Sequence, residues 1–164
     1  MPSRHPSVPA LVDPRGPRLG AALTTLVLAA ALATGWVWLL VLQTVVFALG
    51  AAGRSPYGVL YARLVRPRLG PPAELEDTRP LRFAQAVGLV FTTVALIGLA
   101  APTGVVTLVA TAFALAAAFL NAAFGVCLGC EAYLLLRRAT SSAPIARTVP
   151  NPRAATPTRT EVPA

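Results

Sequence analysis

Charge is scarce in this sequence: Asp, Glu, Lys and Arg make up 12% of its 164 residues, against about 25% in soluble proteins. Lysine is absent, histidine occurs once and cysteine twice. So few potential ligands argue against a self-contained haem or zinc site, and we predict no metal and no cofactor. Hydrophobic residues make up 55% of the chain, which argues against both a soluble domain and a disordered chain. What remains is a small integral membrane protein.

The few charges are unbalanced, with 14 arginines and a formal net charge of +8. A basic balance of this kind is common in proteins that bind nucleic acids. Such binding needs a soluble face that carries the basic side chains, and no soluble scaffold is evident in this chain. We therefore predict no nucleic-acid partner.

The first long apolar run, residues 19–52, contains no charged residue. A single helix of this length is about 50 Å long, whereas a bilayer core is about 30 Å thick. We therefore predict two spans joined by a turn at residues 34–36, where Gly35 frees the backbone and Trp36 suits the interface. Beyond this run, residues 57–65 mix apolar and basic side chains, which predicts an interfacial helix.

The second half of the chain follows the same order. Residues 83–104 predict a third span and a turn, and residues 105–136 are again too long for one span. The first part of this run predicts a fourth span. From about Cys127 the chain either continues that span or bends, at Gly125 or Gly129, and lies along the interface.

These observations predict an all-α membrane protein with four transmembrane helices, arranged as two tandem hairpins with a short interfacial segment after each. The transmembrane domain covers residues 19–138. Disordered, proline-containing segments flank it, an arm of residues 1–18 and a tail of residues 139–164.

The arginines predict the orientation of the chain in the membrane. Three lie in the arm, six in the central loop and five in the tail, whereas the two predicted turns contain none. The positive-inside rule then places both termini and the central loop in the cytoplasm, and the turns outside. We expect membrane lipids, anionic head groups among them, as partners of these basic segments.

A short pattern occurs twice in the chain. The pattern starts at Asp13 and again at Asp77. It reads Asp-x-Arg-x-x-Arg, and it is followed by an apolar residue, a small residue, any residue and an alanine. With a second offset, residues 55–66 overlay residues 127–138. We interpret this as an internal parallel repeat related by an axis along the membrane normal. The copies cover residues 13–68 and 77–138. A cleaved signal peptide, the alternative for the first apolar stretch, would destroy this symmetry.

Each copy of the pattern places a carboxylate and two arginines before a hairpin. Asp13 and Asp77 suit helix N-caps, and arginines three residues apart share a helix face. The simpler interpretation is a cap with arginines that reach to the interface. The alternative is a paired site for a small anion or a lipid phosphate, which guanidinium groups bind well. Its residues would be Arg15, Arg18, Arg79 and Arg82.

The C-x-x-C sequence formed by Cys127 and Cys130 is the one segment with evident reactive chemistry. Three residues apart on a helix, the thiols share a face, and redox dithiols use this spacing. Glu131 follows directly; a carboxylate opposes thiolate formation, although it could shuttle protons. No helix N-terminus is evident at Cys127. The alternative, that both cysteines only fill space between helices, stays open.

The remaining polar residues inside the predicted spans are uncharged. Asn121 in the fourth span and Gln43 in the second predict hydrogen bonds between packed helices or a small polar site. No ionisable side chain lies in the inner part of a span, which argues against a proton pump with a carboxylate relay.

Four segments resemble an uncharacterised bacterial integral-membrane family, domain of unknown function 4395. They read V-D-P-R-G-P-R, R-S-P-Y-G, R-F-A-Q-A-V-G and F-L-N-A-A-F-G-V-C-L-G-C-E-A-Y-L-L-L. The resemblance covers about residues 12–138 and implies a multi-pass protein of the bacterial cytoplasmic membrane. Members of this family occur beside thioredoxin-like and sulfurtransferase-like proteins, which implies a role in thiol redox chemistry or sulfur handling. The residues carried over are Cys127 and Cys130, with Asn121 and Glu131 beside them.

Three hypotheses follow, and whether the protein is an enzyme stays open. The first is a thiol-redox or sulfur-relay partner of a thioredoxin-like or sulfurtransferase-like protein, acting through Cys127 and Cys130. The second is a non-enzymatic scaffold or complex subunit. The third is a transporter or channel for a small anion, which would need a homo-oligomer because four short spans make a poor pore.

Overall fold

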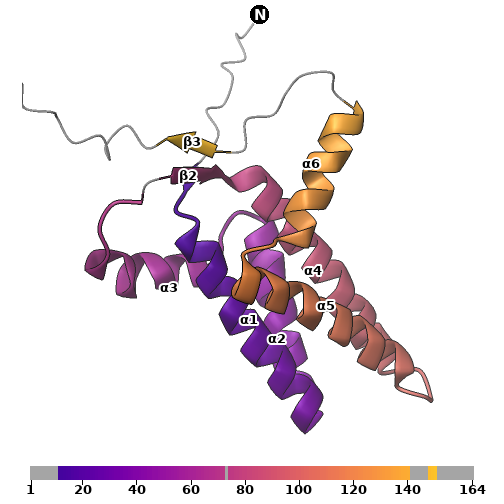
Figure 1. Ribbon diagram of the computed structural model, residues 1–164. Coiled ribbons are helices and arrows are strands. Elements are labelled where there is room, and N and C mark those ends of the chain that lie inside the picture. Colours follow the sequence, from indigo (N-terminus) through magenta and orange to yellow (C-terminus); the bar gives the residue numbers. More distant parts are fainter. Residues whose placement is uncertain (1–10, 73, 141–147, 151–164) are drawn as a thin grey trace, which may run out of the picture.

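The computed structural model describes residues 11–72, 74–140 and 148–150, and most of them are helical (Figure 1). The helices are α1 (Arg15–Thr34), α2 (Val37–Ala51), α3 (Pro56–Leu64), α4 (Thr78–Gly98), α5 (Val105–Phe124) and α6 (Leu128–Thr140), with a 3-10 turn η1 (Arg66–Arg68). The strands are β1 (Leu11–Val12), β2 (Glu74–Asp77) and β3 (Thr148–Pro150).

Two helical hairpins, α1–α2 and α4–α5, form the body of the molecule (Figure 1). Gly35 ends α1 in the left-handed conformation, with φ of 69°, and its N–H donates to the carbonyl of Ala31. Gly104, with φ of 61°, precedes α5 at the other turn. Both turns lie where the sequence predicts them, because only glycine adopts this backbone without strain.

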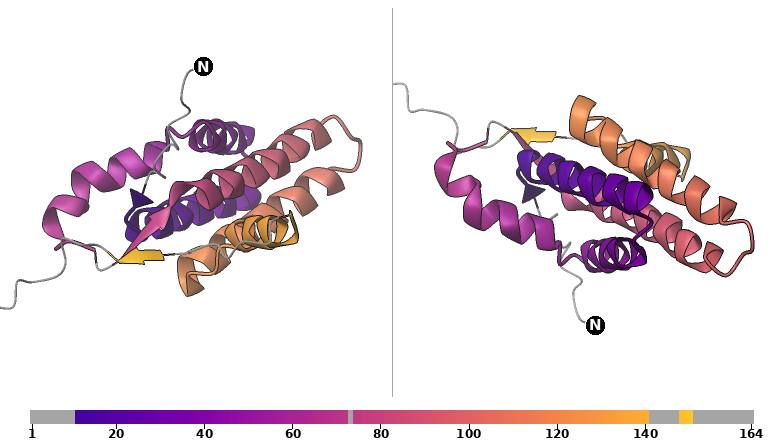
Figure 2. Two further views of the ribbon diagram at one scale, coloured as in Figure 1. Left: turned by 90° about the horizontal axis from the view of Figure 1, so that it is seen from above. Right: turned by 90° about the horizontal axis from the view of Figure 1, so that it is seen from below.

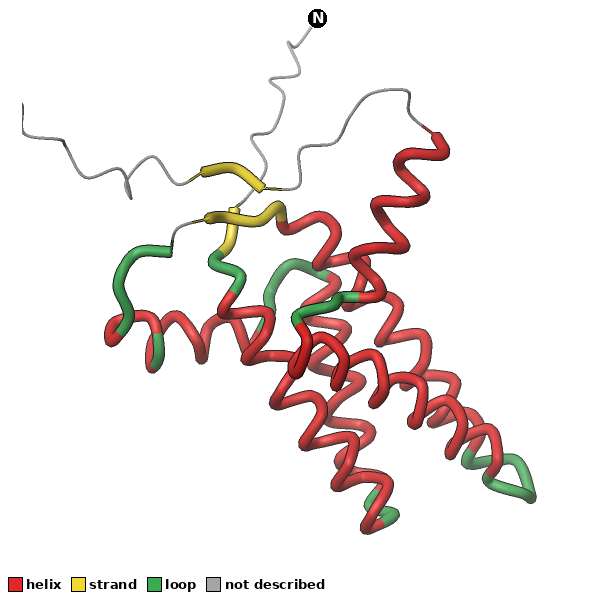
Figure 3. The backbone as a smooth tube through the Cα atoms, viewed as in Figure 1, coloured by secondary structure: helices red, strands yellow, loops and turns green. Residues whose placement is uncertain are grey.

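Three helices, α1, α4 and α5, are long and apolar enough to cross a membrane. The fourth candidate is composite: α2 has 15 residues, and it passes the same test only together with the segment Pro56–Arg68, which is bent from it by 83° (Figure 3). At most 28% of any of the three long spans is buried inside the molecule. Such helices, with their large apolar side chains outward, fit a multi-pass membrane protein.

The helices pair between the two hairpins: α1 lies against α5, and α2 lies against α4 (Figure 2). Small residues allow close contact at this interface: a Cβ atom added to Gly88 of α4 would lie 2.7 Å from the ring of Phe47 in α2. The apolar core is formed by Leu28, Leu40, Ala95, Ala110 and Ala114. Close packing of small residues is the usual way in which helices associate in a membrane.

Two shorter helices follow the hairpins and leave the bundle. The helix α3 packs on α1, and α6 packs on α4. The chain bends at Gly125, whose φ of 71° ends α5, so residues from Leu128 form a separate helix rather than continuing α5. Gly129 brings α6 onto α4, because a Cβ atom there would lie 2.7 Å from the Cα atom of Ala84.

A three-stranded antiparallel sheet lies beside the start of α1 and α4 (Figure 1). Leu11 pairs with Asp77, and Glu76 pairs with both Val12 and Thr148. The structure is mostly helical, in agreement with the all-α prediction, which did not include this small sheet. Segments of two to four residues carry no readable alternation, and they form strands only because the fold brings three distant parts of the chain together.

A buried hydrogen-bond network joins three helices of the first half. Gln43 of α2 is fully buried; its amide nitrogen donates to Thr24 of α1 at 3.2 Å, and its amide oxygen accepts from the hydroxyl of Tyr57 in α3 at 3.1 Å. These contacts place Gln43 among packed helices, the first of the two roles expected for it.

Replacing Gln43 with leucine should lower the free energy of unfolding in detergent micelles by about 0.5–2 kcal/mol, because Thr24 and Tyr57 lose their hydrogen bonds to the amide. Unfolding by sodium dodecyl sulfate, followed by circular dichroism, measures this change. The control is Thr44→Val on the same helix, whose hydroxyl bonds only the carbonyl of Leu40 in its own helix. Equal losses for both variants would contradict an interhelical role.

Replacing Gly129 with alanine should push α6 away from α4, since the obstructing atoms include the backbone of Ala84. We expect local destabilisation of α6 by about 1–3 kcal/mol. Hydrogen exchange followed by mass spectrometry should show faster exchange in α6 and unchanged exchange in α1. Gly70→Ala is the control, because nothing lies within 4 Å of a Cβ atom at that position. Unchanged exchange in α6 would show that the contact is dispensable.

Candidate functional site

The first cysteine lies at the N-cap of α6. The chain leaves α5 at Gly125 and α6 begins at Leu128, so Cys127 directly precedes the helix. The N–H of Cys130 donates to the sulfur of Cys127 at 3.3 Å, and the N–H of Glu131 donates to its carbonyl at 3.0 Å. A side chain that accepts from the third helical N–H is the mark of an N-cap. The expectation that no helix begins at Cys127 was therefore wrong.

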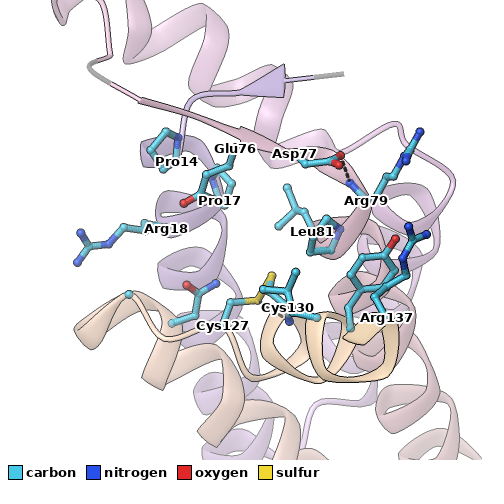
Figure 4. Close-up of a pocket in the computed structure, with 15 residues that line it drawn as sticks. Pro14, Pro17, Arg18, Glu76, Asp77, Arg79, Leu81, Cys127, Cys130 and Arg137 are labelled. Atoms are coloured by element: carbon cyan, nitrogen blue, oxygen red, sulfur yellow. Dashed lines mark hydrogen bonds between the residues drawn. A yellow bond between two sulfur atoms is a disulfide. The ribbon is translucent and has the colours of Figure 1, made fainter. Parts of the chain in front are cut away.

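Cys127 and Cys130 are joined as a disulfide across the first turn of α6 (Figure 4). Their Cα atoms are 5.2 Å apart, within the range that disulfides require. The shared helix face inferred from the spacing therefore brings the two sulfurs together. When the bond is reduced, the partial positive charge of a helix N-terminus favours a thiolate at the N-cap.

A pocket of about 170 Å³ lies beside the disulfide, at the end of the bundle where α6 leaves it. The first turns of α1 and α4, the end of β2, and α6 form its walls (Figure 4). The arginines Arg18, Arg79 and Arg137 line it with exposed side chains, and in Figure 4 their guanidinium groups point away from the sulfurs. Glu76 and Asp77 add two carboxylates, so the rim carries charges of both signs.

The four arginines of the repeated pattern do not share one site. Arg18 and Arg79 line the pocket by the disulfide, whereas Arg15 donates to the carbonyl of Gly70 at 3.4 Å. Arg82 donates through Nε to the carbonyl of Ala51, at the C-terminal end of α2, at 3.1 Å. A cation at a helix C-terminus stabilises the helix dipole, so this last contact has a structural role.

Both aspartates of the repeated pattern hold the start of a helix. The carboxylate of Asp13 accepts from the N–H of Arg15 at 2.9 Å, and that of Asp77 accepts from the N–H of Arg79 at the same distance. Asp13 also accepts from the hydroxyl of Tyr61 in α3 at 2.6 Å. The predicted N-cap is confirmed at Asp77 of α4, whereas Asp13 lies one residue before Pro14, the N-cap of α1, and accepts from the first N–H of that helix.

The other candidate residues divide between the site and the core. Asn121 lies on the last turn of α5 and lines the pocket by the disulfide. Glu131 is half-buried in the first turn of α6 and is not among the residues that line this pocket. Gln43 lies away from the disulfide, in the network with Thr24 and Tyr57. Among the described residues, no group of three or more His, Cys, Asp or Glu side chains could hold a metal ion.

Several site residues are absent from the sequence-based set: Pro14, Pro17, Tyr133, Leu134 and Arg137 all line the pocket. They come from segments that meet only in the folded chain. The N-cap at Cys127 left a signal in the sequence, because the overlay of the two halves aligns it with Ser55. Serine followed by proline is a common helix start, and Ser55 caps α3 by accepting from the N–H of Gly58 at 3.2 Å.

The comparisons with curated proteins and with solved structures find no match. A family described as Domain of unknown function matches residues 12–138, which include all six helices except the last two residues of α6. The match covers most of the chain and agrees in extent with the resemblance seen in the four sequence segments. The protein therefore belongs to the family Domain of unknown function (DUF4395).

Proposed function

We propose that the protein is a membrane-bound dithiol–disulfide exchange partner that acts through Cys127 and Cys130. The observation that carries this proposal is the position of Cys127 at the N-cap of α6, with Cys130 one turn further on. A helix N-terminus stabilises the thiolate form of a cysteine, and the thiolate is the nucleophile in disulfide exchange. A cysteine that served only to fill space would need neither the cap nor a pocket beside it.

The exchange needs no further oxidant or reductant, because bonds, electrons and protons pass only between the protein and its partner. The thiolate of Cys127 attacks a disulfide of the partner and forms a mixed disulfide, while the leaving sulfur of the partner takes up a proton. The thiol of Cys130 then loses its proton and attacks the sulfur of Cys127, which releases the partner as a dithiol and leaves the Cys127–Cys130 disulfide. The reverse sequence reduces the protein. Glu131, adjacent to Cys130, is the candidate proton shuttle for this second step.

The proposed partner is a thioredoxin-like protein, as the family resemblance implies. The pocket supports this choice because it lies at the end of the bundle that also carries β1 and β3, the described segments nearest the two termini (Figure 1). We place that end in the cytoplasm of a bacterial cell, following the arginine counts. Orientation of this kind would let a soluble redox protein reach the disulfide.

We also propose that the two halves are copies of one unit, with four spans in all. Contacts support the equivalence: α1 lies on α5 as α4 lies on α2, and α3 lies on α1 as α6 lies on α4. Ser55 and Cys127 cap equivalent helices through the same N–H position. Arg82 reaches the end of α2, and Arg18 lies beside Gly125 at the end of α5. A parallel repeat explains these pairs together.

The reactivity of single-cysteine variants tests the proposed nucleophile. Cys130→Ser keeps the thiol of Cys127 at the N-cap. Cys127→Ser keeps a capping oxygen, but its remaining thiol, that of Cys130, lies within the helix. At pH 7 in micelles, Cys130→Ser should react with the aromatic disulfide DTNB at least about tenfold faster than Cys127→Ser. Only this variant should form a stable mixed disulfide with a thioredoxin-like protein that lacks its own resolving cysteine. Equal rates, or trapping by both variants, would contradict the assignment.

Cysteines placed in the first copy test the structural equivalence. A Cβ atom at Gly58 would lie 3.4 Å from the Cβ atom of Ser55, close to the separation of about 3.8 Å found in disulfides. In a Cys127→Ala, Cys130→Ala background, the variant Ser55→Cys, Gly58→Cys should therefore oxidise to an intramolecular disulfide. Alkylation with maleimide–polyethylene glycol before and after reduction measures it. Persistent free thiols under oxidant would contradict the equivalence, and Ser55→Cys alone is the control.

A further inference from the structure

A second cavity, of about 260 Å³, lies between the two hairpins and reaches the disulfide from within the bundle. Its walls are mainly apolar, with the aromatic rings of Phe47, Phe91 and Phe113 and the small side chains of α5. Cys127 and Asn121 line both this cavity and the pocket described above. The first turn of α6 therefore separates a charged pocket from an apolar one, with Cys127 on the boundary.

The cavity borders the outer surface of the helices. Phe113, which lines it, is 61% exposed on α5, a helix apolar enough to cross a membrane. The ring of Phe91 lies 6.2 Å from that of Phe113, and the two rings are stacked. A molecule dissolved in the lipid phase could therefore enter beside a flat aromatic wall.

Two amide side chains interrupt the apolar lining, those of Gln85 on α4 and Asn121 on α5. Among the described residues, neither side chain has a hydrogen-bond partner. Both residues are half-buried, and an amide that faces apolar groups rather than water gains from a hydrogen-bond partner. A lipid acyl chain offers no acceptor, whereas a ring that carries carbonyl oxygens can accept hydrogen bonds from amide N–H groups. The volume of about 260 Å³ is just below the usual range of ligand sites, about 300–1,000 Å³, which suits a single ring system.

From these observations we propose that the cavity binds the ring of a membrane quinone, and that the quinone oxidises the reduced cysteine pair. The proposal rests on the proposed function and names the electron acceptor for the same site. The two S–H bonds of Cys127 and Cys130 break and one S–S bond forms. The two electrons and two protons pass to the quinone, whose two carbonyl groups become hydroxyl groups. The disulfide is then ready for a thiol partner at the charged pocket.

The test uses the reduced full-length protein in phospholipid nanodiscs with decylubiquinone, whose fully substituted ring is not alkylated by thiols. We expect one quinone to be reduced for each disulfide formed, followed by quinone absorbance and by maleimide–polyethylene glycol labelling. Ala117→Phe fills the cavity and should slow this reaction about tenfold or more. Ala116→Phe is the matched control, because Ala116 is exposed and outside the lining, and it should stay within about twofold of the wild type.

A second variant tests the polar contact. Gln85→Met keeps the length of the side chain but removes the amide, and Gln85 lines the cavity without lining the pocket by the disulfide. Its oxidation by decylubiquinone should slow, while its reaction with DTNB should match that of the wild type. Equal slowing by Ala117→Phe and Ala116→Phe, or a wild-type protein that decylubiquinone does not oxidise, would overturn the quinone site.

The two proposals fail in different ways. If DTNB and the thioredoxin-like protein react at Cys127 but decylubiquinone does not, exchange stands and the quinone site is wrong. If none of the three reacts with the cysteines, both proposals are wrong. If added phospholipid occupies the cavity and decylubiquinone does not oxidise the cysteines, the cavity is an acyl-chain site. This result would also overturn the quinone proposal.

Discussion

Gly125 turns the chain out of α5 with φ of 71°, and the chemistry of the site depends on this turn. A residue with a side chain strains this backbone, so the helix would tend to continue. Cys127 would then lie inside a long helix, where its sulfur could not cap anything. The turn instead starts a new helix two residues later and gives Cys127 an N–H donor from Cys130. A conformation of one glycine thus decides whether the two cysteines are packing residues or a polarised pair.

The contact between α6 and α4 fixes where that pair lies. Gly129 permits the close approach to Ala84, and the ring of Tyr133 lies 5.6 Å from that of Phe83 one turn away. These contacts hold α6 over the start of α4, so that β2 and the first turn of α1 complete the pocket. The site is built from the N-terminal ends of three helices, which gives it backbone donors as well as arginines.

The sequence predicted the helices well because their signals are local. Apolar runs that are separated at Gly35 and Gly104 place both hairpin turns correctly. Helices α1 and α4 begin four or five residues before the predicted spans, since the arginine patterns form their first turns. The strands could not be predicted, because each is too short to carry a pattern. The N-cap at Cys127 was predictable from its alignment with Ser55, because a serine followed by proline indicates a helix start at the equivalent position.

The two halves of the chain share one architecture but differ in the residues that hold their short helices, α3 and α6. In the first half, Ser55 caps α3, and Tyr57 and Tyr61 tie this helix to Gln43 and Asp13 through hydrogen bonds. In the second half a cysteine takes the place of the capping serine, and α6 packs closely on α4 at Gly129 and through the contact of Tyr133 with Phe83. A cap made of sulfur changes strength with its redox state, whereas a serine cap does not. A change at the cysteines can therefore alter the start of α6, whereas the serine cap of α3 is insensitive to redox state.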